Sequence, residues 1–118
     1  MIRLEITNLP AFQRSLEKLT GDIQGNIKDT LRAGAKDLAV RAKERVPVKS
    51  GELRDGIVTL EGGEGMNYII SATAPHARFV EFGTRKTPAR PFMVPAAEEV
   101  FPQILDNLAG AINKAIRN

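Results

Sequence analysis

The sequence predicts an α+β fold, in which a small antiparallel β-sheet packs against a long helix in the N-terminal half and a C-terminal helix. Three patterns predict this fold. Apolar and polar residues alternate at the start, apolar residues recur every three or four positions over 23–42 and 101–116, and β-branched residues flank a glycine-rich turn at 62–65. With 118 residues, the chain is expected to form a single domain over 1–118.

The first elements are predicted to be a short strand and a short helix. Apolar residues at positions 2, 4 and 6 alternate with polar residues, as in a strand that is buried on one face. Asn8 can then cap a helix, with Pro10 in its first turn and apolar residues at positions 9, 12, 16 and 19. Gly21 is expected to end this helix, because glycine adopts left-handed geometry without steric cost.

A second and longer helix is predicted to follow, with Thr20 or Asp22 as its cap. Pro47 disfavours helical geometry at the preceding residue, so the helix should end there. Asp37 and Arg41 have the spacing of a surface ion pair within a helix. The buried stripe is predicted to comprise Ile23, Ile27, Leu31, Ala35, Leu38 and Ala42.

The second half of the chain is predicted to contain a hairpin and a final helix. The hairpin should span 53–72, followed by a compact segment at 75–82 and a basic loop at 83–91. Pro102 either kinks the last helix or separates its first turn, because proline removes a backbone donor. The buried stripe of this helix is predicted to include Phe101, Ile104, Leu105, Leu108, Ile112 and Ile116.

The composition argues against several functional classes. The chain has no cysteine, which excludes disulfides and thiolate metal sites and fits a reducing cytoplasm. No apolar run is long enough to span a membrane, and the start of the chain does not resemble a secretory signal. A formal net charge of +3 is too small to indicate nucleic-acid binding by itself.

Candidate catalytic residues are sparse. His76 is the only histidine, and no serine lies in a Gly-x-Ser-x-Gly turn that could expose a nucleophile. Glu98 and Glu99 are adjacent, so on a helix they point about 100° apart and resemble a solvated helix start more than an acid–base pair. We therefore predict no enzymatic activity, catalytic residue, cofactor, metal or small-molecule substrate.

Three short segments combine glycine or proline with charged and apolar residues. They are 46–54 (VPVKSGELR), 77–84 (ARFVEFGT) and 89–96 (ARPFMVPA). Their simplest interpretation is structural, as a helix stop, a loop start and a helix start, because glycine and proline punctuate every fold. Their order and spacing along the chain are nevertheless more distinctive than any single segment.

Taken together, the three segments resemble the family of tail components and neck proteins of long-tailed bacteriophages. The resemblance extends in organisation over about residues 25–118, with His76 near a position where such proteins often carry tyrosine. The motif residues that carry it are Pro47, Ser50, Gly51, Leu53, Arg54, Val80, Glu81, Gly83, Thr84, Pro91, Phe92, Pro95 and Ala96.

The resemblance implies a structural subunit of the head–tail connection or tail-completion complex, which forms a closed, six-fold ring with copies of itself. Such a subunit is made in the host cytoplasm, resides in the virion at the head–tail junction or tail end, and contacts other neck and tail proteins. We predict that Arg85, Lys86 and Arg90 lie at a subunit contact or line the lumen, where they could touch passing DNA without reading its sequence.

The sequence is also compatible with two other functions. The chain could be a small basic protein that binds nucleic acid without sequence specificity, although Asp29, Asp37 and Glu44 interrupt the basic side of the second helix. It could also be a small hydrolase, if carboxylates that are distant in the sequence came together in the fold.

Overall fold

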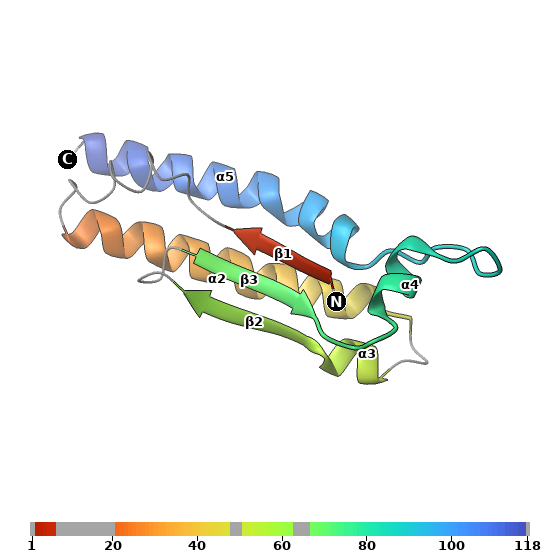
Figure 1. Cartoon of the computed structure of the whole chain (residues 1–118). Coiled ribbons are helices and arrows are strands. Elements are labelled where there is room, and N and C mark those ends of the chain that lie inside the picture. The colour runs from red at the N-terminus through yellow and green to blue at the C-terminus, as the bar shows by residue number, and fades with distance from the viewer. Residues whose placement is uncertain (1, 7–20, 48–50, 63–66, 118) are drawn as a thin grey trace.

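A computed structural model describes residues 2–6, 21–47, 51–62 and 67–117 (Figure 1). In chain order the elements are β1 (Ile2–Ile6), α2 (Gly21–Arg45), α3 (Gly51–Asp55), β2 (Ile57–Gly62), β3 (Asn67–Ala72), α4 (Ala77–Phe82) and α5 (Met93–Arg117). The sheet, α2 and α5 share one hydrophobic core. The predicted α+β fold, with an antiparallel sheet and two long helices, is therefore confirmed.

The sheet has three strands in the order β1-β3-β2, and both outer strands run antiparallel to β3. Ile70 of β3 is buried and lies opposite Leu4 on β1 and Thr59 on β2. Successive side chains of a strand point to opposite faces, so Val58 and Leu60 lie on the other face, where both are exposed. The strand predicted at the start of the chain is confirmed.

The predicted hairpin begins later than expected. Gly51–Asp55 form the short helix α3, whose Leu53 is buried, and the hairpin starts only at Ile57. The amide of Gly56 donates to the carbonyl of Glu52 at 2.9 Å, so helical bonding continues almost to the strand. A helix of five residues is too short to show a helical period in its sequence. The β-branched residues that follow it favoured the prediction of a strand instead.

The long helix α2 closely follows its prediction. It ends at Arg45, two residues before Pro47. Arg41 donates to Asp37 at 3.3 Å, as the spacing predicted. Of the predicted stripe, Ile23 is half-buried, and the fully buried members are Ile27, Leu31, Ala35, Leu38 and Ala42.

The beginning of α2 differs from the prediction. Gly21 is the first residue of this helix, although it was expected to end the preceding one, and Asp22 lies inside the helix and not at its cap. The predicted first helix, from Asn8 onward, and the alternative cap Thr20 lie outside the described residues.

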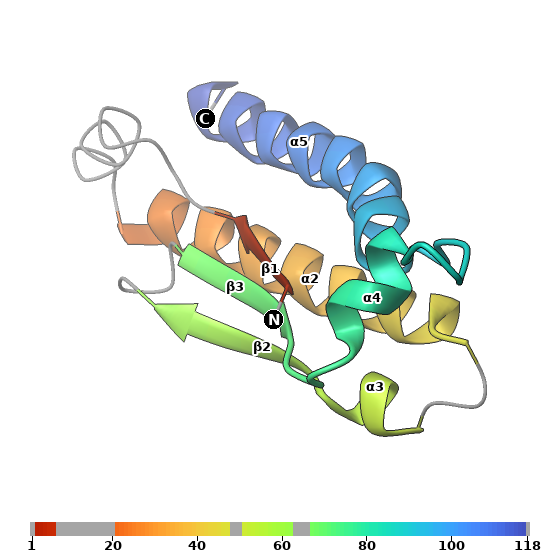
Figure 2. The same cartoon turned by 45° about the vertical axis from the view of Figure 1, so that its right-hand side comes forward.

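Helices α2 and α5 pack side by side and run in opposite directions (Figures 1 and 2). Gly34 allows this close approach, because a Cβ atom at that position would lie 2.5 Å from Cγ1 of Ile104. Glu99 links the same two helices, since it accepts hydrogen bonds from Arg45 and, at 3.2 Å, from Arg41. Glu99 therefore does not mark a solvated helix start as predicted, and α5 begins six residues earlier, at Met93.

The stripe predicted for α5 is only partly correct. Ile104 is buried, and Leu108 and Ile112 pack against the core. Phe101 and Leu105 are exposed, because the apolar arc of this helix is wider than the surface it buries against α2.

Two further points of the α5 prediction concern Pro102 and Ile116. The helix is continuous from Met93 to Arg117, so Pro102 does not separate a first turn. The side chain of Ile116, predicted to be buried, lies outside what the structure describes.

A polar cluster joins α2 to the hairpin. The Glu61 carboxylate accepts hydrogen bonds from the Tyr68 hydroxyl at 3.0 Å and from the Arg32 guanidinium at 3.2 Å. These two donors hold the pKa of Glu61 below its usual range. Burial, followed by the bond to Glu61, raises the pKa of Tyr68. The cluster is a structural tie between the helix and the sheet.

Candidate functional site

The three sequence segments meet at one end of the molecule. We call residues 77–92, which lie at this end, the tip. Helix α4 lies beside the start of α5, and the loop between them projects beyond both helices (Figures 1 and 2). The end of α2 and helix α3 lie at the same end of the molecule. Segments separated by about forty residues in the sequence thus form one surface.

Glu81 joins the second segment to the third. Its side chain is 98% buried, since only 2% of the residue is exposed. The carboxylate accepts hydrogen bonds from the backbone amides of Phe92 at 3.2 Å, Met93 at 2.8 Å and Val94 at 3.3 Å. These amides lie at the start of α5 and have no partner within the helix. A negative charge at this end also interacts favourably with the positive end of the helix dipole. Glu81 therefore caps α5 from another element.

Gly83 allows the chain to leave α4. Its φ angle is +76°, in the left-handed region that residues with side chains rarely adopt. A Cβ atom there would also lie 2.8 Å from the amide nitrogen of Ala89 and 2.9 Å from the carbonyl oxygen of Thr87. Both constraints require glycine at this position.

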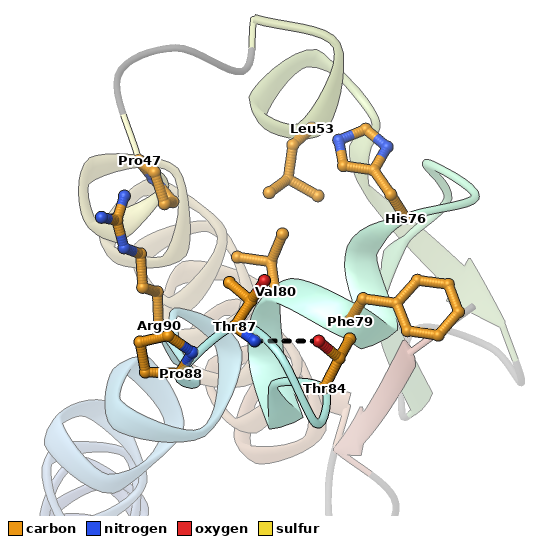
Figure 3. A pocket seen from close by; sticks show the side chains of 9 residues that line it. All are labelled: Pro47, Leu53, His76, Phe79, Val80, Thr84, Thr87, Pro88 and Arg90. Carbon is orange, nitrogen blue, oxygen red and sulfur yellow. Dashed lines mark hydrogen bonds between the residues drawn. The ribbon is translucent and has the colours of Figure 1, made fainter.

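Hydrogen bonds set the shape of the loop after Gly83. The amide of Thr84 donates to the carbonyl of Thr87 at 2.9 Å, and the amide of Arg90 donates to the carbonyl of Val80 at 2.7 Å. The Thr84 hydroxyl oxygen accepts from the amides of Lys86 at 3.2 Å and Thr87 at 3.1 Å, and the latter bond is drawn in Figure 3. The loop is thus closed on itself and anchored to α4.

A cavity of about 260 Å³ lies where the segments converge (Figure 3). Leu53 and Val80 point toward one another across it, and the Arg90 side chain extends toward Pro47. Most of the lining is apolar. The lining residues are Pro47, Leu53, His76, Phe79, Val80, Thr84, Thr87, Pro88 and Arg90.

The other described motif residues are divided between the surface and the core. Gly51 and Arg54 are exposed on α3, whereas Ser50 lies outside the described residues. Phe92 and Ala96 are buried in the core, Pro91 is exposed, and Pro95 lies in the first turn of α5.

The outer surface of the tip is apolar and basic. Phe79 is 58% exposed and Phe82 is 64% exposed, and the Phe79 ring points away from the cavity in Figure 3. The exposed cations are Arg78, Arg85, Lys86 and Arg90. The only acid between residues 77 and 92 is the buried Glu81, so no carboxylate within the tip offsets these charges at its surface.

Sequence reasoning did not identify Phe79 and Phe82 as surface groups. Their spacing of three residues would place them on one face of a helix, but the segment was expected only to be compact. Pro88 and Thr87 were also overlooked as cavity residues, because nothing in the sequence relates them to Leu53.

Among the described residues, no group of three or more histidine, aspartate or glutamate side chains could hold a metal ion. Over the same residues, no helix is long and apolar enough to cross a membrane. The Glu81 carboxylate, which belongs to the second segment, accepts hydrogen bonds from three backbone amides at the start of α5.

Comparison with known proteins identifies the family. Residues 11–83 match the family described as "Bacteriophage HK97-gp10, putative tail-component". The match covers more than half of the chain and includes the first segment and all but the last residue of the second. It ends before the third segment, which Glu81 joins to the second. The chain matches no curated protein and no solved structure. The chain therefore belongs to the HK97-gp10-like family of bacteriophage tail components.

Proposed function

We propose that this protein is a structural subunit of the head–tail connection or tail-completion complex, and that copies of it form a closed ring in the virion. The tip serves as the contact with the neighbouring subunit. The observation that carries this proposal is the exposure of Phe79 and Phe82 beside a basic loop. Apolar surface with a polar rim is typical of interaction sites, because burying it releases water.

The construction of the tip also supports the proposal. Glu81 and Gly83 fix the loop before any partner arrives, so little conformational entropy is lost on binding. A ring with head-to-tail contacts needs two different complementary surfaces on each subunit, and the tip would be one of them. Six-fold symmetry, contacts with other neck and tail proteins, and a position at the head–tail junction or tail end are parts of this proposal.

Alanine substitution tests the role of the tip. In a phage or prophage that lacks its own copy of the gene, a variant with Arg85→Ala, Lys86→Ala and Arg90→Ala should lower the yield of joined, infectious particles at least about tenfold, because interface charges favour the correct encounter. The matched control is Lys36→Ala, Lys43→Ala and Lys114→Ala, which removes three exposed cations elsewhere. Normal joining by the tip variant would refute the role of the loop.

The exposed cations favour a second candidate, in which the chain is a small basic protein that binds nucleic acid. Such binding would be independent of sequence and would weaken steeply with salt, because bound cations release counterions from phosphates. A gel-shift titration of the isolated chain at two salt concentrations distinguishes the candidates. Submicromolar, salt-sensitive binding by a monomer favours the DNA-binding candidate, and its absence favours the subunit contact.

A further inference from the structure

Helix α5 carries an exposed apolar surface with acidic residues beside it, whereas the charged residues exposed on the tip are basic. Val94, Phe101 and Leu105 are separated by seven and four residues, so they lie on one face of the helix within about 40°. All three are exposed, and Leu105 is 66% exposed. Glu98 lies on the same face, and Asp106 lies about 100° around the helix from Leu105, at the edge nearer Glu99. Both acids are exposed. We call these five residues the α5 strip.

The charges of α5 are separated along its length, because its cations, Lys114 and Arg117, lie in its last turn. From Met93 to Asn113 the sequence contains Glu98, Glu99 and Asp106 but no lysine or arginine. Glu99 is neutralised within the chain by Arg41 and Arg45. The acids that remain available to a partner are therefore those of the α5 strip.

The tip and the α5 strip complement each other. The tip offers exposed phenylalanines and an apolar cavity with basic side chains around them, and the strip offers exposed apolar side chains with carboxylates beside them. The exposure of Phe101 and Leu105 means that the tip of the same copy does not cover the strip. The two surfaces are different, so their contact would be head-to-tail, the type that generates rings.

We propose that the tip of one copy docks on the α5 strip of the next copy. This inference rests on the proposed function, and it names the second surface that a head-to-tail ring requires. Apolar anchors at the centre of the contact would exclude water, and the opposite charges around them would set orientation and suppress contacts between two tips.

Charge reversal tests the pairing. One variant carries Arg85→Glu and Lys86→Glu, a second carries Glu98→Lys and Asp106→Lys, and a third carries all four substitutions. In the complementation assay each double variant should lose at least about tenfold in infectious particles, because like charges then face one another. The quadruple variant should recover most of the yield, because opposite charges face again. Co-expression of the two double variants should also restore assembly, through alternating copies.

The outcomes separate this inference from the proposed function. If tip reversal blocks assembly but strip reversal does not, or if the quadruple variant fails to recover, the tip has another partner, so the inference is overturned while the proposed function stands. If neither reversal affects assembly, both are overturned. Thermal unfolding of each purified variant shows whether it still folds. All four residues are exposed, so their substitution should be tolerated. A large loss of stability on strip reversal would indicate a contact within the chain and would also overturn the inference.

Discussion

At the scale of single residues, Glu81 matters most for the tip. Its carboxylate is buried and satisfies three backbone amides that would otherwise have no partner at the start of α5. Removing a buried acceptor costs more than the net value of its hydrogen bonds, because the abandoned donors stay desolvated. Glu81 therefore holds α4, the loop and α5 in their mutual positions.

We predict that Glu81→Ala lowers the free energy of unfolding by about 2 kcal/mol, and that Glu81→Gln, which keeps one acceptor oxygen, lowers it less. Glu44→Ala is the matched control, because it removes an exposed acid from a helix. Chemical denaturation with a common slope would measure these differences. Equal midpoints for Glu81→Ala and Glu44→Ala would show that the cap contributes nothing.

This residue also marks a limit of sequence analysis. The second segment contains Glu81 and Gly83, but nothing in it indicates that the carboxylate caps a helix that begins twelve residues later. Local rules for helix caps consider only the residues next to the helix start. A cap supplied by another element can be recognised only once the fold brings the two together.

At the scale of elements, helices with long repeating patterns of apolar residues were predicted correctly, and the shortest helix was not. Helix α2 has 25 residues, and its stripe of small and aliphatic residues repeats often enough to identify both the helix and its buried face. Helix α3 has five residues and was mistaken for part of the hairpin. Helix α5 was recognised, but Phe101 and Leu105 were wrongly assigned to the core, because periodicity cannot tell whether an apolar face meets its own chain or a partner.

The tie between α2 and the hairpin should depend on pH. The bonds from Tyr68 and Arg32 lower the pKa of Glu61 in the folded state. The stabilisation from Glu61 is therefore present above the unfolded pKa, about 4.3, and is lost as pH falls through the lower folded value. We predict that the difference in unfolding free energy between the wild type and Glu61→Gln narrows from pH 7 to pH 3.

Denaturation at both pH values measures this difference, with Asp106→Asn as an exposed control. For the control, no comparable narrowing is expected. A Glu61→Gln difference that is the same at both pH values would show that the cluster contributes nothing to pH-dependent stability.

At the scale of the whole molecule, the fold separates the tip and the α5 strip from the core. The sheet, α2 and the inner face of α5 supply the apolar interior. The tip and the outer face of α5 keep phenylalanine and leucine side chains in contact with solvent. Covering these side chains would release free energy, and in our proposal this free energy stabilises the ring.

The most direct test of the account is to image the purified particle by cryo-electron microscopy. The account predicts a closed ring of copies at the head–tail junction or tail end, six-fold in our proposal, with loop 83–91 of each copy at the contact with its neighbour. Absence of the protein from the particle, or a ring in which every tip faces solvent, would contradict it.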